Sequence, residues 1–251
     1  MSKQASSGTG LKGWGRSVLD LLWPLLCPAC HAGLAPGAEA GNFCASCAME
    51  MCPIEPPFCQ VCAEPFPGDI PGDFTCPNCG GRHQAYDFAV CRWLSRGPVR
   101  EVIHRLKYHH AQAMRLPLAR LMLPALEDQR LAGSSWLLVP VPLHARKHRQ
   151  RRYNQSAELT RALARLSGWP WHNSLRRIRY TVSQAGLDRE DRLKNLRGAF
   201  ALRHWAARHI EGRDILLIDD VLTTGATAHE CALTLKNNGA RRVAVLTAAR
   251  G

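Results

Sequence analysis

Residues 215–227 have the sequence Ile-Leu-Leu-Ile-Asp-Asp-Val-Leu-Thr-Thr-Gly-Ala-Thr. The apolar run predicts a buried strand over 215–219, with two adjacent carboxylates, Asp219 and Asp220, at its carboxyl end. The turn that follows leads into a helix predicted over 226–237. This order of strand, turn and helix predicts an α/β protein whose ligand site lies beyond the end of the strand.

The turn between this strand and helix is suited to binding a phosphate group. Backbone N–H groups at a helix start are free to donate hydrogen bonds, and threonine hydroxyls accompany them here. Because two carboxylates beside a phosphate would repel it, we expect a ribose diol to lie between them and donate hydrogen bonds to Asp219 and Asp220. The alternative is an Asp-Asp turn before a capped helix. The expected cradle residues are Thr223, Thr224, Gly225, Ala226 and Thr227.

Strands and helices are predicted to alternate from about residue 85 onward. Apolar runs predict strands, and apolar residues at every third or fourth position predict helices. The expected strands are 86–94, 136–141, 215–219 and 243–248. The expected helices are 99–107, 115–126, 154–166 and 226–237. This pattern predicts a doubly wound, mostly parallel sheet that is covered on both faces.

Eight of the eleven cysteines form four Cys-x-x-Cys pairs. The pairs repeat as Cys-x2-Cys-x13-Cys-x2-Cys, and each cysteine of the second half lies 32 positions after its counterpart in the first. Two such pairs offer four thiolates to one tetrahedral ion, so the spacing predicts two structural zinc sites. The eight expected ligands are Cys27, Cys30, Cys44, Cys47, Cys59, Cys62, Cys76 and Cys79.

Alternatives to this zinc assignment stay open. The fixed offset favours pairing within each half, but a cross-braced arrangement would let the first and third pairs share an ion. His31 or His83 could also replace a cysteine ligand. A redox dithiol normally occurs singly after a strand, whereas this segment is rich in glycine and proline and lacks apolar periodicity. Because the segment cannot bury a core of its own, we expect metal coordination to stabilise it.

The basic residues are unevenly distributed. The chain has 33 basic and 20 acidic residues; residues 1–80 hold three and seven of these, which leaves 30 and 13 in 81–251. The second part is therefore suited to binding an anion, either a nucleic acid or a small ligand such as a pyrophosphate. A solvated basic surface without a ligand is the alternative.

No run of 18 or more apolar residues is present, which argues against a membrane span. Residues 18–26 are apolar but short, are interrupted by Asp20 and Pro24, and precede no small-residue cleavage site. We therefore expect a cytoplasmic protein in a reducing compartment, where cysteines bind metal ions rather than form disulfides.

Short motifs outside residues 215–227 resemble those of a known family. They are Leu-Lys-Tyr at 106–108, Val-Pro-Val-Pro-Leu at 139–143, Asn-Gln at 154–155, Gly-Ala-Phe at 198–200, and the single residues Thr181, Gln184, Leu187, Arg192 and Asn195. Together with the loop they resemble the type I phosphoribosyltransferases and, more narrowly, the ComF family, which is associated with bacterial DNA uptake and use. One departure is Arg152, which stands where that family usually has glycine.

The resemblance implies a domain organisation and a ligand. It implies a tail with a short helix over 1–24, a double zinc ribbon over 25–82 and a type I phosphoribosyltransferase domain with a hood over 83–251. The implied ligand is 5-phosphoribosyl 1-pyrophosphate, with Mg²⁺ bridging its pyrophosphate and ribose oxygens. The leaving pyrophosphate must be neutralised. The residues expected to do this follow the strand at 136–141 and are Arg146, Lys147, Arg149 and Arg151.

The polar stretch 181–195 is similar to the mobile loop that closes over such sites. Its expected contacts to the ligand are Thr181, Gln184, Arg189 and Arg192. Lys107 lies in the region that forms the hood over the acceptor in the resembling enzymes. For each of these basic residues, a solvated side chain is the alternative.

Several function classes remain open at this point. The chain is either a transferase with an unidentified acceptor, or a binding protein for single-stranded DNA or a partner of DNA-uptake machinery that uses the ribosyl-pyrophosphate site as a sensor. A transcriptional regulator is a weaker third class, because the acidic balance of residues 1–80 argues against DNA reading by the zinc ribbons. A glutamine-dependent amidotransferase is disfavoured because no glutaminase domain is present. The sequence identifies neither the acceptor nor the oligomeric state.

Overall fold

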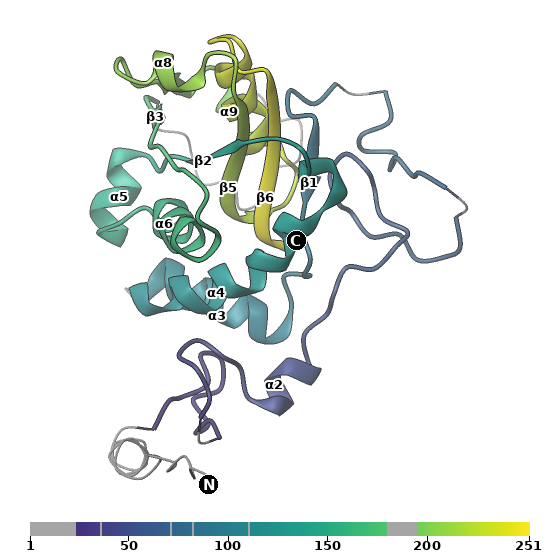
Figure 1. Ribbon diagram of the computed structural model, residues 1–251, viewed down its shortest axis with the longest axis vertical. Helices are drawn as coiled ribbons and strands as arrows, with labels where there is room; N and C mark the ends of the chain where they lie inside the picture. Colours follow the sequence, from purple (N-terminus) through teal and green to yellow (C-terminus); the bar gives the residue numbers. More distant parts are fainter. Residues whose placement is uncertain (1–23, 36, 71, 82, 110, 180–194) are drawn as a thin grey trace, which may run out of the picture.

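A four-stranded parallel sheet forms the centre of the protein, with the strand order β1-β6-β5-β2 (Figure 1). The computed structural model describes residues 24–35, 37–70, 72–81, 83–109, 111–179 and 195–251. The sheet consists of β1 (Phe88–Val90), β2 (Trp136–Pro140), β5 (Asp214–Leu222) and β6 (Arg242–Arg250). The predicted α/β class with a parallel sheet is confirmed.

Two layers cover the sheet, because neighbouring residues of each strand point to opposite faces. In β5, Leu216 and Ile218 pack on one face, whereas Ile215 and Leu217 pack on the other. The first face is covered by α3 (Gly97–Tyr108), α4 (Arg115–Met122) and α6 (Gln155–Ser167). The second face is covered by α9 (Ala226–Lys236), by the antiparallel hairpin of β3 (Leu175–Arg177) and β4 (Phe200–Leu202), and by the second cysteine group.

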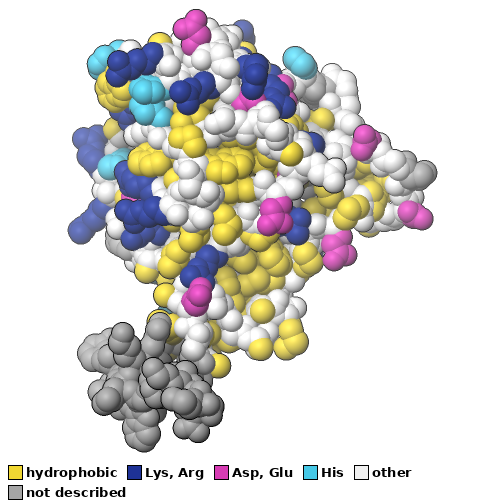
Figure 2. Space-filling view, in the orientation of Figure 1, with side chains coloured by type: hydrophobic (Ala, Val, Ile, Leu, Met, Phe, Trp, Pro, Cys, Tyr) yellow, Lys and Arg dark blue, Asp and Glu magenta, His cyan; other side chains and the backbone are white. Residues whose placement is uncertain are grey.

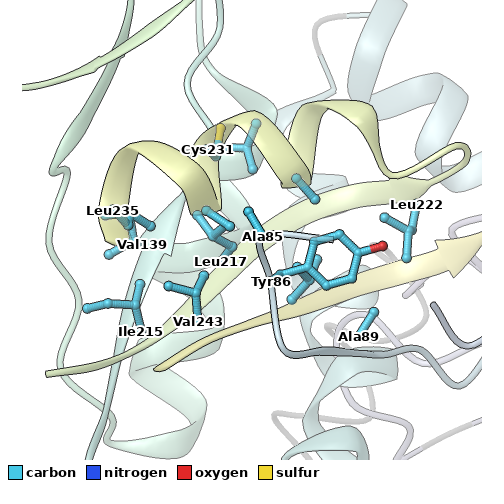
Figure 3. Close-up of a cluster of buried hydrophobic side chains, with 14 of the residues drawn as sticks. Ala85, Tyr86, Ala89, Val139, Ile215, Leu217, Leu222, Cys231, Leu235 and Val243 are labelled. Atoms are coloured by element: carbon cyan, nitrogen blue, oxygen red, sulfur yellow. The ribbon is translucent and has the colours of Figure 1, made fainter. Parts of the chain in front are cut away.

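The core of the second face surrounds a buried tyrosine. Figure 3 shows the Tyr86 ring among the side chains that α9, β5 and β6 contribute, with its hydroxyl on the side of Leu222. Only 2% of Tyr86 is exposed. Strand β5 lies between β6 and β2, and Asp219 of β5 aligns with Thr247 of β6. The end of the sheet at which the strands finish therefore has the Asp219 segment near its middle.

The predicted helices are present, with ends that local chemistry explains. Asn154 precedes α6 and accepts a hydrogen bond from the Ser156 N–H, as an N-cap residue does. The helix predicted over 115–126 ends at Met122 and continues as a 3₁₀ helix (Leu123–Glu127), because Pro124 lacks the N–H that an α-helix needs there.

The strand predicted over 86–94 is shorter than expected, because only Phe88–Val90 pairs in the sheet. Residues beyond it pair with the cysteine-rich module instead: Leu94 N–H donates to the Cys52 carbonyl at 2.9 Å. Three short α-helices among the described residues were not predicted: α2 (Ala45–Met49), α5 (Ala145–Arg151) and α8 (Ala207–Ile210). The β3–β4 hairpin was not predicted either.

The arginine-rich segment 145–151 is a helix rather than an open turn. It ends at Arg152, whose φ is +65°, in the left-handed region that glycine occupies without steric cost. Arg152, which stands where the resembling family usually has glycine, therefore has a backbone conformation that favours glycine.

The two halves of the cysteine-rich module contact different parts of the sheet domain. Its first half lies beside α3 and α4, where the Arg105 Nη1 donates to the Pro28 carbonyl and Arg120 Nη1 donates to Asn42 Oδ1 at 2.8 Å. Its second half packs on the sheet, where the Ala89 N–H donates to the Val61 carbonyl at 2.8 Å. Among the described residues, no helix combines the length and apolar character needed to cross a membrane.

Candidate functional site

A cavity of about 500 Å³ opens at the carboxyl end of β5. Its lining comes from the end of β5, the loop leading into α9, helix α3, and the segment from β2 to the start of α6, together with Arg177 of β3 and Val245 and Thr247 of β6. The structure brings many predicted site residues together here. They are Lys107, Lys147, Arg151, Asp219, Asp220, Thr223, Thr224, Gly225, Ala226 and Thr227.

Other predicted residues lie elsewhere. Arg146 and Arg149 do not line this cavity, and Arg149 instead lines a neighbouring one. The reason is that 145–151 is helical, so that successive basic side chains point in different directions. Thr181, Gln184, Arg189 and Arg192 fall outside the residues that the structure describes.

The loop from Thr223 to Thr227 has the form expected of a phosphate cradle. Gly225 has a φ of +78° and lies immediately before the first residue of α9. A Cβ atom at this position would lie 2.8 Å from the Tyr86 hydroxyl oxygen, so the backbone has no room for a side chain. The start of α9 lies at the positive end of the helix dipole, and Ala226 and Thr227 of its first turn line the cavity. The Ala226 N–H lies 3.5 Å from Thr224 Oγ1.

The two carboxylates at the end of β5 have different surroundings. Asp219 Oδ1 accepts hydrogen bonds from the Ser156 hydroxyl at 2.7 Å and the Asp220 N–H at 2.9 Å. Burial raises the pKa of Asp219 to about 7, and the neighbouring Asp220 charge adds to this rise. Asp220 Oδ1 lies 2.9 Å from Lys107 Nζ, whereas its buried Oδ2 has no hydrogen-bond partner among the described residues. Asp220 lines the cavity, and a ligand hydroxyl or a cation is the kind of group that satisfies an orphaned carboxylate oxygen.

Five cationic side chains line the cavity with this carboxylate pair: Arg100, Lys107, Lys147, Arg151 and Arg177. Burial lowers the pKa of Lys147, and the Arg177, Arg151 and Lys107 charges lower it further, so these cations are close enough to repel one another. For Lys107 burial also lowers the pKa, but the Asp220 and Asp219 charges outweigh it and the pKa is raised. Repelling cations gathered in one cavity are suited to a ligand that carries several negative charges.

Arg177 was not predicted as a site residue. It lies at the end of β3 in the hairpin, and its guanidinium lies 5.3 Å from the Phe200 ring centroid. The sequence offered only the pair Arg176-Arg177 in a stretch without clear periodicity. Ser156 and Gln155 were likewise missed as site residues; the buried Gln155 Oε1 has no partner among the described residues and its side chain lines the cavity.

A second cavity of about 700 Å³ adjoins the first and is strongly basic. Its lining includes six arginines, whereas its only acidic residue is Glu158. The six are Arg149, Arg152, Arg161, Arg176, Arg177 and Arg203. Both cavities share Arg177. Figure 2 shows basic side chains grouped on the side of the molecule where Figure 1 draws α5, β3 and α8, and acidic side chains on the cysteine-rich module.

Exposed aromatic rings accompany two of these arginines. Trp171 is 37% exposed and Trp205 is 47% exposed. The Arg161 guanidinium lies 5.3 Å from the Trp171 ring centroid, and that of Arg203 lies 5.4 Å from the Trp205 ring centroid. This second cavity, with Trp171 and Trp205 beside it, is called the arginine groove below.

The eight predicted cysteine ligands form two groups, and the groups follow the halves of the repeat. Within each group the four sulfur atoms lie within 4.8 Å of one another, which fits a tetrahedral zinc ion. The cross-braced arrangement is therefore excluded, and neither His31 nor His83 is part of a group. The groups are Cys27, Cys30, Cys44 and Cys47, and Cys59, Cys62, Cys76 and Cys79.

Backbone N–H groups lower the thiol pKa of one cysteine in each group. Burial raises the pKa of Cys27, but N–H donors from Cys30 and Cys44 outweigh it and lower the pKa to about 6. In the second group burial again raises the pKa of Cys59, and backbone donors lower it to about 7. A thiolate that forms near neutral pH is ready to bind a metal ion.

Comparisons with known proteins agree with these features. Residues 18–80 match the family described as "Double zinc ribbon domain". The chain is 31% identical to the DNA utilization protein YhgH of Salmonella typhimurium over 222 residues, which cover 81% of this chain and 95% of that protein. It is also 31% identical to competence protein F of Haemophilus influenzae, over 70% of this chain and 78% of that protein.

Solved structures that are similar to part of this chain include phosphoribosyltransferases. The glutamine phosphoribosylpyrophosphate amidotransferase from B. subtilis is 16% identical, with a TM-score of 0.37 over 58% of this chain and 30% of that one. A hypoxanthine phosphoribosyltransferase from Staphylococcus aureus is 14% identical, with a TM-score of 0.27 over 59% of this chain and 62% of that one. The relatives and the double zinc ribbon together show that this chain belongs to the ComF family of competence and DNA utilization proteins.

Proposed function

We propose that this chain binds 5-phosphoribosyl 1-pyrophosphate with Mg²⁺ in the first cavity and transfers its ribosyl group to an acceptor. One observation carries the proposal. A carboxylate pair and a phosphate cradle lie at one end of β5, and five cationic side chains line the same cavity. The ligand has one group for each of these three features: a diol, a phosphate monoester and a pyrophosphate.

Each part of the site has a proposed role. The N–H groups at the start of α9 and the hydroxyls of Thr223, Thr224 and Thr227 bind the 5-phosphate. Asp219 and Asp220 accept hydrogen bonds from the ribose hydroxyls. Magnesium, when bound, would neutralise pyrophosphate charge, and Asp220, whose Oδ2 has no hydrogen-bond partner among the described residues, is the residue that would help to hold it.

The cations would act on the leaving group. In a transfer, the bond between ribose C1 and the pyrophosphate oxygen breaks, its electron pair leaves with pyrophosphate, and the acceptor's lone pair forms the new bond to C1. Positive charge builds up on the ribose ring and negative charge on pyrophosphate. Lys147, Arg151 and Arg177 are placed on the cavity to stabilise the departing charge.

A calorimetric titration tests the binding step. We expect 5-phosphoribosyl 1-pyrophosphate with magnesium to bind the wild-type chain, and the double variant Asp219→Asn, Asp220→Asn to lose binding. The matched control is Asp69→Asn, Asp73→Asn, which removes two exposed carboxylates from the cysteine-rich module and should bind normally. Unchanged affinity in the first double variant would place the ligand elsewhere. Release of pyrophosphate in the presence of candidate acceptors then tests transfer.

A second candidate function is binding of single-stranded DNA. The arginine groove supports it, since six arginines line it and two exposed tryptophans lie beside it. Arginines would neutralise backbone phosphates, and exposed rings offer stacking surfaces to unpaired bases. The printed names of the relatives associate those proteins with DNA utilization and competence. A cytoplasmic protein that cooperates with DNA-uptake machinery is consistent with this candidate.

Fluorescence anisotropy with a labelled single-stranded oligonucleotide tests the groove. We expect binding to weaken steeply between about 50 and about 200 mM salt. The double variant Arg161→Ala, Arg203→Ala should bind more weakly, whereas Arg92→Ala, an exposed arginine that does not line the groove, should not. Because Arg177 lines both cavities, 5-phosphoribosyl 1-pyrophosphate should compete with DNA. No binding at low salt would exclude this candidate.

A further inference from the structure

Arg250 joins the second zinc ribbon to the start of the phosphate loop. The second zinc ribbon is the half of the module that contains Cys59, Cys62, Cys76 and Cys79, and the phosphate loop is the cradle segment 223–227. Its side chain is 8% exposed and lies at the end of β6. Its Nε donates to the backbone carbonyl of Cys62 at 3.1 Å, and its Nη1 donates to the backbone carbonyl of Leu222 at 2.9 Å. Cys62 belongs to the second sulfur group, and Leu222 immediately precedes Thr223. One guanidinium therefore connects a metal-binding residue to the phosphate cradle.

The same guanidinium is held from a third side. Its Nη2 forms an ion pair with Glu64, which also belongs to the second ribbon. A guanidinium is planar and rigid, so its donors keep a fixed relative geometry. Any movement of the Cys62 and Glu64 segment must then either break these bonds or be passed on to Leu222.

A second contact connects the same two regions. The chain leaves the second ribbon and reaches Tyr86, whose hydroxyl lies where a side chain of Gly225 would otherwise be. The neighbouring Ala85 N–H donates to His229 Nδ1 in α9 at 3.2 Å. The loop and the helix that follows it are thus supported from beneath by residues adjoining the second ribbon.

The first ribbon has no equivalent connection among the described residues. Its side-chain hydrogen bonds to the sheet domain come from Arg105 in α3 and Arg120 in α4. Neither reaches the phosphate loop. The two sulfur groups are similar in sequence but differ in what they support.

We propose that Arg250 is a positioning residue that fixes the phosphate loop to the second zinc ribbon, so that metal in the second site, but not in the first, sets the geometry of the cradle. If the Cys62 segment loosens, Arg250 loses an anchor and the loop samples more conformations. A ligand that binds one of those conformations then binds more weakly in proportion to its reduced population. The measurement of ligand binding described below rests on the proposed function, whereas the measurement of hydrogen exchange in the loop does not.

Hydrogen exchange measured by mass spectrometry on the full chain tests the loop directly. In Arg250→Met we expect the peptide containing residues 222–227 to exchange about tenfold faster or more than in the wild type. Arg130→Met is the matched control. Arg130 also connects the second ribbon to the core, donating to the Gln60 carbonyl at 2.9 Å, but it makes no hydrogen bond to the loop. It should leave exchange of this peptide unchanged while both variants retain about two zinc ions.

Several outcomes would overturn the inference. Wild-type exchange in Arg250→Met would show that the bridge does not position the loop, and equal acceleration in Arg130→Met would show general loosening of the ribbon. Should Arg250→Met fail to fold, Glu64→Gln removes only the ion pair at a 40% exposed side chain, and it should accelerate the same peptide by a smaller factor. No acceleration in Glu64→Gln would then count against the proposal.

The metal arm compares the two sulfur groups. Cys76→Ser should accelerate exchange in 222–227, whereas Cys44→Ser should not. Equal acceleration in the two cysteine variants would also overturn the inference. In the ligand arm, Arg250→Met should weaken binding of 5-phosphoribosyl 1-pyrophosphate and Arg250→Lys should not restore it, because one ammonium cannot span both carbonyls. Absence of ligand binding by the wild type would refute the proposed function while leaving the exchange result to decide on Arg250.

Discussion

Lys107 Nζ lies 2.9 Å from Asp220 Oδ1 and joins helix α3 to the carboxyl end of β5. The two side chains are 22% and 6% exposed, so the pair is mostly withdrawn from water. In the absence of a ligand, the Lys107 ammonium compensates the charge of the Asp220 carboxylate, which would otherwise be unfavourable to bury.

Replacing Lys107 by methionine should destabilise the free protein by on the order of 2 kcal/mol, a value between those of exposed and fully buried pairs. The cause is the uncompensated charge that remains on Asp220. Adding Asp220→Asn to Lys107→Met should recover much of the loss, because no buried charge is left. Urea unfolding of the two single variants and the double variant measures the coupling, and strictly additive effects would contradict it.

The raised pKa of Asp219 predicts how stability depends on pH. Its pKa is about 7 in the folded protein and near 3.8 when unfolded, so the folded state binds the proton more tightly. The contribution of Asp219 to stability therefore falls as the pH rises from about 4 to about 7 and is level above that. Asp219→Asn should raise the melting temperature more at about pH 8 than at about pH 5.5. The opposite order would show that Asp219 is stabilised as a carboxylate.

Gly225 should not tolerate alanine. Gly225→Ala combines the cost of a left-handed φ, about 1 to 2 kcal/mol, with a 2.8 Å contact to the Tyr86 hydroxyl oxygen. Gly168→Ala is the matched control, since Gly168 has a φ of +74° and open space around the Cβ position. Thermal unfolding should show a larger loss for Gly225→Ala than for Gly168→Ala, and adding Tyr86→Phe should reduce the difference. Equal losses would mean that the contact is relieved without cost.

Arg152→Gly should stabilise the protein by about 1 kcal/mol, because glycine adopts the φ of +65° found at this position without steric cost. Denaturant unfolding measures the gain. Arg152 also lines the arginine groove, so the same variant should bind single-stranded DNA more weakly if that candidate function holds. A destabilised Arg152→Gly would show that the arginine side chain contributes more than its backbone strain costs.

Purified protein should contain about two zinc ions per chain, because two complete sets of four sulfurs are present. Elemental analysis measures this directly. Cys76→Ser should release one ion and unfold only the second ribbon, which limited proteolysis can locate. One ion or none in the wild type, together with readily reacting thiols, would contradict the double zinc ribbon.

The sequence determined the features that depend on local pattern. The Cys-x2-Cys-x13-Cys-x2-Cys repeat predicted the eight thiolate ligands, because four thiolates need fixed local spacing, whereas the structure decided their pairing within each half. The run 215–227 placed the carboxylates, the turn and the helix start, because a buried strand, a glycine and a helix N-terminus each have a strong local signature.

Tertiary structure decided which distant side chains meet. Lys107 pairs with Asp220 and Ser156 with Asp219 only because α3 and α6 pack on the same face of the sheet. The helical form of 145–151 separates Arg149 from Lys147, and the β3–β4 hairpin brings Arg177 to the first cavity. Neither placement can be predicted from the types of these residues alone. The connection from Cys62 to Leu222 spans 160 residues of sequence through Arg250, and only the parallel pairing of β5 and β6 beside the second ribbon brings these groups together.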